Sequence, residues 1–335
     1  MTTTPLALSL GDPAGIGPEI TVKAWRALRE TGPAFMVIGD RQALASASGA
    51  PTPLQTVHGP NEVSRIFADA LPVLDIPLAA PVVAGQPNVA NGGAVLRWIE
   101  TGAGLTLSGA VSGLVTAPIA KASLYAAGFR FPGHTEFLAE LSAAGHRDGP
   151  RGPVMMLIAG DLRVALVTIH EPLAAVPGLL TIEKIVNAGL VTDQALRRDF
   201  GIERPRLVVA GLNPHAGEAG TIGREEIDII APAARALRDL GVQVQGPLPA
   251  DSLFHAEARA GYDAVLCLYH DQALIPVKML DFWGGVNVTL GLPIIRTSPD
   301  HGTGFDIAGR GLARPDSLIA AIRLAAELAD RRGGR

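Results

Sequence analysis

Short apolar runs alternate along the chain with longer segments in which apolar residues recur every three or four positions. The short runs predict buried strands, and the longer spacing predicts amphipathic helices. Seven runs have the strand pattern, at residues 6–10, 34–39, 110–115, 154–159, 162–169, 206–212 and 263–269. Five segments have the helical pattern, at residues 19–29, 136–144, 182–199, 225–240 and 316–330. This alternation predicts an α/β protein with a parallel or mixed sheet.

The length and composition indicate an ordinary folded protein. A chain of 335 residues is typical of two domains, and 48% hydrophobic with 18% charged residues excludes a disordered chain. The 39 glycines and 26 prolines have no repeating period, which excludes collagen and predicts many tight loops. Because there is no low-complexity linker, we expect the domains to be joined by short crossovers.

Charge and cysteine content limit the partners and the compartment. The net charge is −4 without a basic run, which argues against nucleic acid and anionic membranes as partners. The N-terminal residues lack the pattern of a signal peptide, and Asp161 and Arg163 interrupt the longest apolar stretch. The single cysteine, Cys267, cannot form an internal disulfide and is interpreted as a core residue. We therefore expect a cytoplasmic protein without a membrane segment.

A glycine-rich segment, GDPAGIGPE at residues 11–19, follows the first predicted strand. Pro18 and Glu19 are typical of the first turn of a helix. Backbone amides at such a turn can hold an anion, although a plain tight turn explains the same pattern. The segment is neither a Walker loop nor the GxGxxG dinucleotide fingerprint of a Rossmann fold.

Three histidines, His170, His215 and His270, each lie just beyond an apolar run. Binding sites in α/β sheets form beyond the carboxyl ends of strands, so the three imidazoles could converge. Three neutral imidazoles with an open fourth position suit a catalytic divalent metal, whereas hydrogen-bonded structural histidines are the alternative. Asp271 follows His270 and either orients its imidazole or caps a helix.

Two further segments carry residues suited to anions. His134 and Thr135 stand at the start of a predicted helix, where Thr135 can cap the helix and free amides favour phosphate. A surface histidine beside a simple cap is the alternative. The glycine-rich stretch 278–309, which we expect to be loops, carries Lys278, Asn287, Arg296, Asp300, His301 and Asp306. Its Lys and Arg suit an anionic substrate, unless they are solvated surface charges.

Seven motifs together resemble the 4-hydroxythreonine-4-phosphate dehydrogenase family of pyridoxal phosphate biosynthesis over nearly the whole chain. They are GDPAGIGPEI, FPGHTEFLAE, VTIHEPL, NPHAGE, PADSLF, YHDQALIPVK and VNVTLGLPIIRTSPDHGTGFDIAG. The first and last are also similar to segments of the isocitrate and isopropylmalate dehydrogenase superfamily, which binds NAD without a Rossmann fingerprint. The resemblance implies two α/β/α domains with a cleft between them, at about residues 1–120 with 272–335 and at 121–271. It also implies a homodimer whose active site is shared between subunits.

The same resemblance implies roles for individual residues. The metal ligands would be His170, His215 and His270, one of them from the other protomer, with Zn²⁺ favoured and Mg²⁺ or Co²⁺ as alternatives. The substrate-binding residues would be His134, Thr135, Lys278, Asn287 and Arg296. The cofactor would be NAD, with NADP as an alternative, bound by His301, Gly302, Thr303, Gly304 and Asp306. The candidates for proton transfer are Lys278, Asp251 and Asp271.

The implied reaction is NAD-dependent oxidation of 4-phosphooxy-L-threonine at its C3 hydroxyl, followed by loss of CO₂ to give 3-amino-2-oxopropyl phosphate. Glu171, directly after His170, departs from the neutral residue expected there. A related dehydrogenase acting on a four-carbon sugar-acid phosphate is therefore one alternative. From other classes, a metal hydrolase with three histidine ligands and a binding protein without catalytic activity are the remaining alternatives.

Overall fold

The computed structural model describes residues 4–47, 51–131 and 133–333 and divides into two compact units. The first unit comprises Met1–His146 and Leu292–Arg335, and the second comprises Arg147–Gly291. Both limits lie further along the chain than the residues 120 and 271 that the sequence suggested. Each unit is an α/β structure with its own strands and covering helices, and the expected α/β fold class is confirmed.

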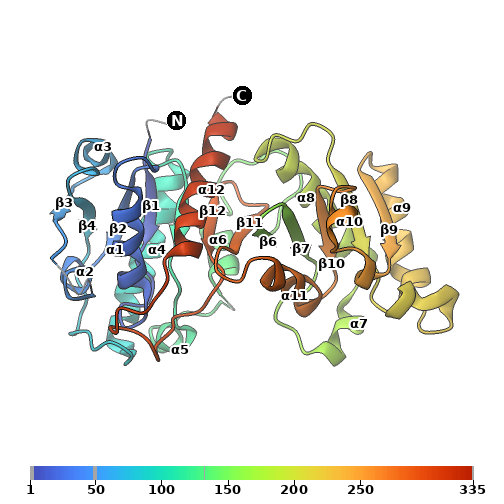
Figure 1. The fold of residues 1–335 in the computed structure, drawn as a ribbon, viewed down its shortest axis with the longest axis horizontal. Helices are drawn as coiled ribbons and strands as arrows, with labels where there is room; N and C mark the ends of the chain where they lie inside the picture. Colours follow the sequence, from blue (N-terminus) through green and yellow to red (C-terminus); the bar gives the residue numbers. More distant parts are fainter. Residues whose placement is uncertain (1–3, 48–50, 132, 334–335) are drawn as a thin grey trace. The chain divides into compact units, whose positions relative to one another are not determined.

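Among its described residues, the first unit contains six strands in the order β3-β4-β2-β1-β5-β12, all of whose hydrogen-bonded pairs are parallel (Figure 1). The strands are β1 (Leu6–Ser9), β2 (Phe35–Gly39), β3 (Leu54–Thr56), β4 (Leu71–Asp75), β5 (Leu114–Thr116) and β12 (Arg296–Pro299). The helices are α1 (Gly17–Leu28), α2 (Arg41–Ala47), α3 (Val63–Ile66), α4 (Gly92–Leu107), α5 (Lys121–Ala126), α6 (His134–Leu141) and α12 (Asp316–Gly333).

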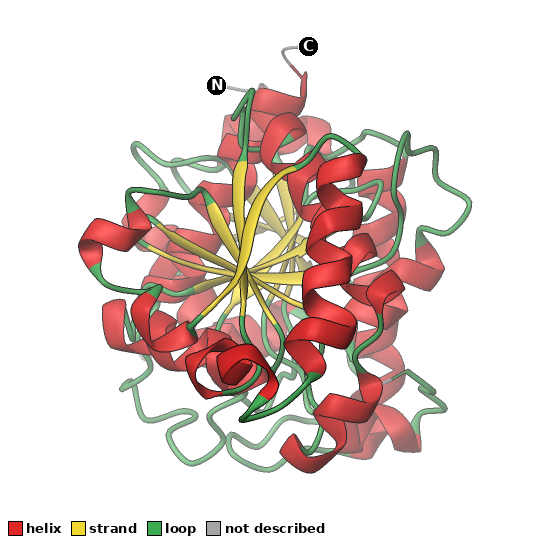
Figure 2. Ribbon diagram, turned by 90° about the vertical axis from the view of Figure 1, so that its right-hand side faces the viewer, coloured by secondary structure: helices red, strands yellow, loops and turns green. Residues whose placement is uncertain are grey.

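The central strands of this sheet are buried along their whole length, as parallel strands covered on both faces are. Helix α4 packs on β1, β2 and β5, and α12 packs on β12, β5 and β1. Figure 2, in which strands are yellow and helices are red, shows helices on both sides of the strands of the molecule. Helix α1 begins at the glycine-rich segment, with Pro18 in its first turn as the sequence predicted.

The second unit contains six strands in the order β11-β6-β7-β10-β8-β9. The pairs β11/β6 and β6/β7 are antiparallel, whereas β7, β10, β8 and β9 run parallel to one another. The strands are β6 (Val154–Ala159), β7 (Leu162–Leu166), β8 (Arg206–Ala210), β9 (Gln243–Leu248), β10 (Ala264–Cys267) and β11 (Val286–Leu290). The α-helices are α7 (Val176–Leu179), α8 (Ile182–Arg198), α9 (Ala231–Asp239), α10 (Ala256–Arg259) and α11 (His270–Leu280).

Helix α8 illustrates how local sequence sets an element of this unit. The side chain of Thr181 caps its N-terminus by accepting a hydrogen bond from the Lys184 amide at 3.2 Å, and Arg197 and Arg198 occupy its last turn. The helix packs against α9 and against the strands β6, β7, β10 and β11. The helix therefore begins and ends close to the limits that its periodicity predicted.

The expectation that residues 278–309 are loops is wrong, because the stretch contains the end of α11 and the strands β11 and β12. Strand β12 is buried at every position, but its sequence is polar, so it lacks the apolar pattern that predicts a buried strand. Two of its side chains form hydrogen bonds inside the unit: Arg296 donates to Thr116 Oγ1 at 2.8 Å and Thr297 donates to the Ala321 carbonyl at 2.8 Å. Hydrogen-bond partners from distant segments thus offset the cost of burying a polar strand in the core.

Within the described ranges, no single helix is long and apolar enough to cross a membrane. A bent pair, Leu173–Leu179 followed by Ile182–Arg198 at 92°, satisfies the length and composition requirement only when taken together.

Candidate active site

The three predicted metal-ligating histidines follow three neighbouring strands of the second unit. Strands β7, β10 and β8 are parallel neighbours, so their carboxyl ends meet at one edge of the sheet. His170 follows β7, His215 follows β8, and His270 is the first residue of α11 after β10. All three histidines therefore follow strand ends, as the sequence indicated, and these strand ends lie at the same edge of the sheet.

His170 and His270 lie together, with ring centroids 5.6 Å apart and ring planes inclined by 45°. The side chain of His215 is 69% exposed. Among residues 4–47, 51–131 and 133–333, no three His, Cys, Asp or Glu side chains are grouped closely enough to hold one metal ion. The structure thus brings two of the three predicted ligands together within the chain and leaves His215 outside the pair.

The carboxylate of Asp271 contacts the imidazole of His270 and does not cap the helix. Its Oδ1 lies 2.7 Å from His270 Nδ1, and the N-cap of α11 is Tyr269 without a side-chain cap. The alternative of Asp271 as an N-cap is therefore wrong. A carboxylate on Nδ1 holds the ring so that Nε2 is the nitrogen available to a metal. Glu171, the departure from the family pattern, is exposed to solvent.

A buried polar network joins the segments that carry the three histidines. Thr168 Oγ1 donates to the Leu268 carbonyl at 2.6 Å, which connects the end of β7 to the end of β10. Gln272 accepts a hydrogen bond from the Leu268 amide and donates to the Gly211 carbonyl, each at 2.7 Å. Sequence reasoning missed Thr168 and Gln272. The only signal was a polar residue two positions from His170 and another two positions from His270, and such residues are common at strand ends.

Among the predicted anion-binding residues of the first unit, His134 lies within electrostatic reach of the buried guanidinium of Arg296. Arg296 is 4% exposed, and burial lowers its pKa to about 10, opposed by the charge of Glu136. Burial and the charge of Arg296 hold the pKa of His134 well below its usual value, so the imidazole is neutral at neutral pH. His134 Nε2 is shielded from solvent and makes no hydrogen bond within the described residues.

Thr135 is buried inside α6, and the N-cap of that helix is Gly133, without a side-chain cap. The interpretation of Thr135 as the capping residue is therefore wrong.

Three predicted residues of the second unit have different surroundings. Lys278 is half-buried on α11, and its Nζ lies 5.3 Å from the centre of the Phe282 ring. Asn287 is half-buried on β11, and its Oδ1 is shielded from solvent without a hydrogen bond inside the described part of the chain. Asp251 is exposed in a short 3₁₀ turn, Ala250–Ser252.

The two segments that resemble cofactor-binding loops lie against each other within the first unit. The Ile16 amide donates to the Thr303 carbonyl at 2.8 Å, and a Cβ at Gly15 would lie 2.7 Å from the same oxygen. Gly304 packs on the side chain of Ile16. Beside this contact Asp12 is buried, and burial raises its pKa despite a hydrogen bond from the Ala14 amide. His301, Gly302 and Asp306 are exposed in the same loop.

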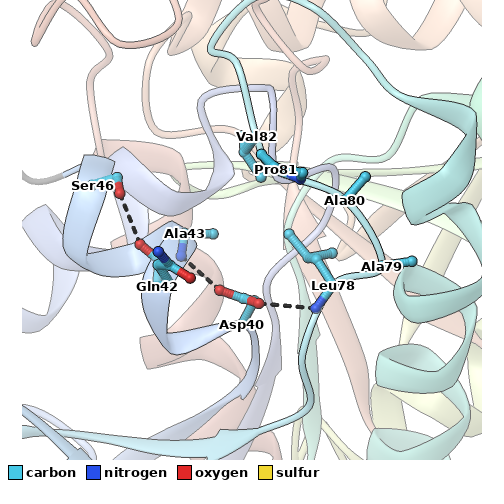
Figure 3. A pocket seen from close by; sticks show the side chains of 9 residues that line it. All are labelled: Asp40, Gln42, Ala43, Ser46, Leu78, Ala79, Ala80, Pro81 and Val82. Atoms are coloured by element: carbon cyan, nitrogen blue, oxygen red, sulfur yellow. Dashed lines mark hydrogen bonds between the residues drawn. The ribbon is translucent and has the colours of Figure 1, made fainter.

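A separate cavity of about 350 Å³ lies beyond β2 and β4 in the first unit (Figure 3). Asp40 Oδ1 accepts a hydrogen bond from the Ala43 amide and Oδ2 accepts one from the Leu78 amide, at 2.7 and 2.9 Å. The carboxylate thus ties two loops together. No residue that the sequence placed in the active site lines this cavity, so we do not assign it to the candidate site.

Comparisons with known proteins identify the family. The sequence profile of the family "Pyridoxal phosphate biosynthetic protein PdxA" matches residues 32–325. The chain is 72% identical over 333 residues to the 4-hydroxythreonine-4-phosphate dehydrogenase of Caulobacter vibrioides, covering 99% of this chain and 100% of that protein. It is 58% identical over 334 residues to the same-named protein of Maricaulis maris, covering 98% of each.

Among solved structures, the 4-hydroxythreonine-4-phosphate dehydrogenase of Klebsiella pneumoniae matches with a TM-score of 0.86 and 40% identity, over 97% of this chain and 98% of that one. The matches extend over nearly the full length of the relatives, so the resemblance inferred from seven motifs is confirmed across both units. The chain therefore belongs to the pyridoxal phosphate biosynthetic protein PdxA family, whose members compared above are dehydrogenases.

Proposed function

We propose that this chain catalyses the NAD-dependent oxidation of 4-phosphooxy-L-threonine at C3 and its decarboxylation to 3-amino-2-oxopropyl phosphate. The observation that carries the proposal is a pair of shielded polar atoms, His134 Nε2 and Asn287 Oδ1, neither hydrogen-bonded within the described residues. A buried polar group without a partner destabilises a protein by about 1–3 kcal/mol. Both atoms belong to residues expected to bind substrate, and a polar ligand would satisfy them.

Each unit contributes a positively charged residue of a type that suits a phosphorylated amino acid. Arg296 presents a planar guanidinium that can bind phosphate or carboxylate through two hydrogen bonds, and Lys278 adds a compact ammonium. His134 stays neutral within reach of the charge of Arg296, so it can form a hydrogen bond without adding a positive charge. These residue types support a substrate with a phosphate and a carboxylate rather than a neutral one.

The histidines at the sheet edge fit a divalent metal by their donor type. His170 and His270 are adjacent, and Asp271 leaves His270 Nε2 available for a metal. In the proposed homodimer the third imidazole comes from the other subunit, as the family resemblance implies. When bound, Zn²⁺, Co²⁺ or Mg²⁺ would supply Lewis acidity toward the substrate oxygen.

The residues of the chain position the substrate and move its protons. In the proposed sequence, C3 loses a hydride and its hydroxyl loses a proton, the C1–C2 bond then breaks to release CO₂, and C2 gains a proton. NAD⁺, when bound, supplies the acceptor for the hydride, with NADP⁺ as the alternative. Lys278 is the candidate we favour for proton transfer, because the Asp271 carboxylate is engaged by His270 and Asp251 is exposed.

An exposed apolar surface on and after α11 supports a homodimer. Ile275, Met279, Phe282 and Trp283 are 63, 82, 59 and 51% exposed, and we call them the α11 apolar patch. Exposed apolar side chains grouped in this way are typical of protein interfaces. The patch adjoins Lys278 and lies on the helix that begins at His270, so a second copy covering it would lie beside two proposed site residues.

The decisive experiment mixes the purified protein with NAD⁺ and 4-phosphooxy-L-threonine and follows NADH absorbance and CO₂ release, with and without a chelator. We expect equal amounts of NADH and CO₂, and loss of both with the chelator. The variant Arg296→Met should raise KM by at least tenfold, since a charge-assisted hydrogen bond is worth about 1.5–3 kcal/mol. Absence of NADH from a metal-replete sample would refute the substrate, and chelator-sensitive hydrolysis without NAD⁺ would favour the hydrolase alternative.

A further inference from the structure

His215 lies on a turn with an unusual backbone. The turn spans Pro214–Gly220, and φ is 53° at His215, 51° at Ala216, 78° at Gly217, 41° at Glu218 and 55° at Ala219. Residues with a Cβ disfavour this left-handed region, because the Cβ approaches the following carbonyl oxygen. Four such residues in one short turn must be held by their surroundings, and conformations of this kind cluster at functional sites.

The carboxylate of Glu226 holds the strand end from which this turn departs. Its Oε1 accepts hydrogen bonds from the Leu212 and Asn213 amides at 2.8 and 2.7 Å. Its Oε2 accepts a third, from Asn213 Nδ2 at 2.9 Å. Glu226 is 3% exposed, so these bonds are shielded from solvent. Glu225 receives a further hydrogen bond from the same Asn213 amide group, at 2.7 Å.

The backbone at Gly217 and Gly223 packs closely against the side chains of Glu226 and Asn213. A Cβ at Gly217 would lie 2.6 Å from Glu226 Oε2, so the middle of the turn passes directly over the carboxylate. A Cβ at Gly223 would overlap the side-chain amide of Asn213. Glu226 also begins a π-helical segment, Glu226–Ile230, a rare conformation that is frequent at functional sites.

We propose that Glu226 is a positioning residue for His215: its buried carboxylate holds the left-handed turn in the conformation that presents the imidazole to a metal ion. The inference rests on the proposed role of His215 as a ligand. Glu226 itself does not touch the metal or the substrate. It acts by holding the backbone amides of Leu212 and Asn213, which directly precede the left-handed turn, and so it fixes the position at which the turn begins.

Two substitutions separate this role from a general contribution to stability. Glu226→Ala removes all three hydrogen bonds. Glu226→Gln keeps the shape but brings an NH₂ group against the Asn213 amide or the backbone amides, which are themselves donors. Asp228→Asn is the matched control, because Asp228 lies on the same π-helical segment, is exposed and forms its ion pair with Arg224, at 2.9 Å, rather than with the turn.

The experiment measures Co²⁺ affinity of the full-length protein by its visible absorption, together with hydrogen exchange of the Leu212 and Asn213 amides in the metal-free protein. We expect both Glu226 variants to bind Co²⁺ 10- to 100-fold more weakly, as residues that support metal ligands do, and to exchange these two amides faster. Asp228→Asn should match the wild type in both measurements. Unchanged Co²⁺ affinity despite faster exchange would overturn the inference, since the hydrogen bonds of Glu226 would then stabilise the fold without positioning His215.

The variant His215→Ala distinguishes failure of this inference from failure of the proposed function. If His215→Ala binds Co²⁺ as tightly as the wild type, or the wild type does not bind it, His215 is not a ligand and the proposed metal site fails with the inference. If His215→Ala weakens binding and Glu226→Gln does not, only the role of Glu226 is refuted.

Discussion

The buried amide of Gln272 offers a direct test of how the histidine-bearing segments are held together. Its side chain is 7% exposed and bridges the Leu268 amide and the Gly211 carbonyl, with both hydrogen bonds at 2.7 Å. Gln272→Leu keeps the approximate volume but leaves both backbone groups without this partner. The perturbation thus acts on the connection between the segment before His215 and the segment before His270.

The size of the effect follows from the two backbone groups. Each buried group left without a hydrogen bond destabilises the fold by about 1–3 kcal/mol. Burial of the new apolar side chain recovers roughly 1 kcal/mol. We therefore expect Gln272→Leu to reduce the free energy of unfolding by about 3 kcal/mol. With a urea m-value of about 1–3 kcal/mol/M, the midpoint of unfolding should fall by about 1–3 M.

Urea unfolding followed by far-ultraviolet circular dichroism measures this change. The control is Gln245→Leu, an exposed position on β9 of the same unit, which should alter the free energy of unfolding by less than about 0.5 kcal/mol. Metal affinity of Gln272→Leu should fall by about tenfold or more, because two ligand-bearing segments lose their bridge. An unchanged midpoint together with unchanged metal affinity would refute the reasoning.

Three further predictions concern other parts of the molecule. The pKa of His134 is lower in the folded protein than its value of about 6.5 in the unfolded chain. The unfolded chain therefore binds a proton more readily, and the folded protein loses stability as the pH falls below about 6.5. His134→Gln should therefore reduce the loss of stability between pH 6.5 and 5, where one such group contributes a slope of at most about 1.4 kcal/mol per pH unit. Met279→Glu in the α11 apolar patch should shift sedimentation velocity from dimer to monomer, whereas Leu240→Glu, 60% exposed on the same unit, should not. Asp271→Asn should weaken metal binding by about tenfold with little change in stability, because its carboxylate is 71% exposed and acts through His270.

Each of these predictions has a result that would contradict it. A pH profile of stability that is the same with and without His134 would mean that its imidazole is not held neutral. A wild-type protein that sediments as a monomer would remove the basis for the homodimer. Metal affinity unchanged by Asp271→Asn would show that the carboxylate does not orient the imidazole of His270.

The sequence by itself determined the elements whose signals are local. Periodicity located seven of the described strands, among them β1 and β10, and long helices such as α8, because a strand of apolar residues or a helix with one apolar face carries its pattern within itself. It missed the strands β4 and β11 and the 16-residue helix α4. It also identified Cys267 as a core residue, and the thiol is fully buried with its pKa raised by burial. The motif histidines were found because each follows an apolar run, and the family followed from the order of the motifs.

Only the tertiary structure decided how those pieces are held together. The polar strand β12 is stable because Thr116 and the Ala321 carbonyl, from distant segments, receive its hydrogen bonds. Gln272 and Glu226 became recognisable only when folding placed the Gly211 carbonyl and the Leu212 amide beside them. A buried polar side chain takes its role from the donor or acceptor it meets, and that partner is set by strand order rather than by neighbouring sequence. For this reason the sequence could indicate the ligands, whereas the residues that support them required the fold.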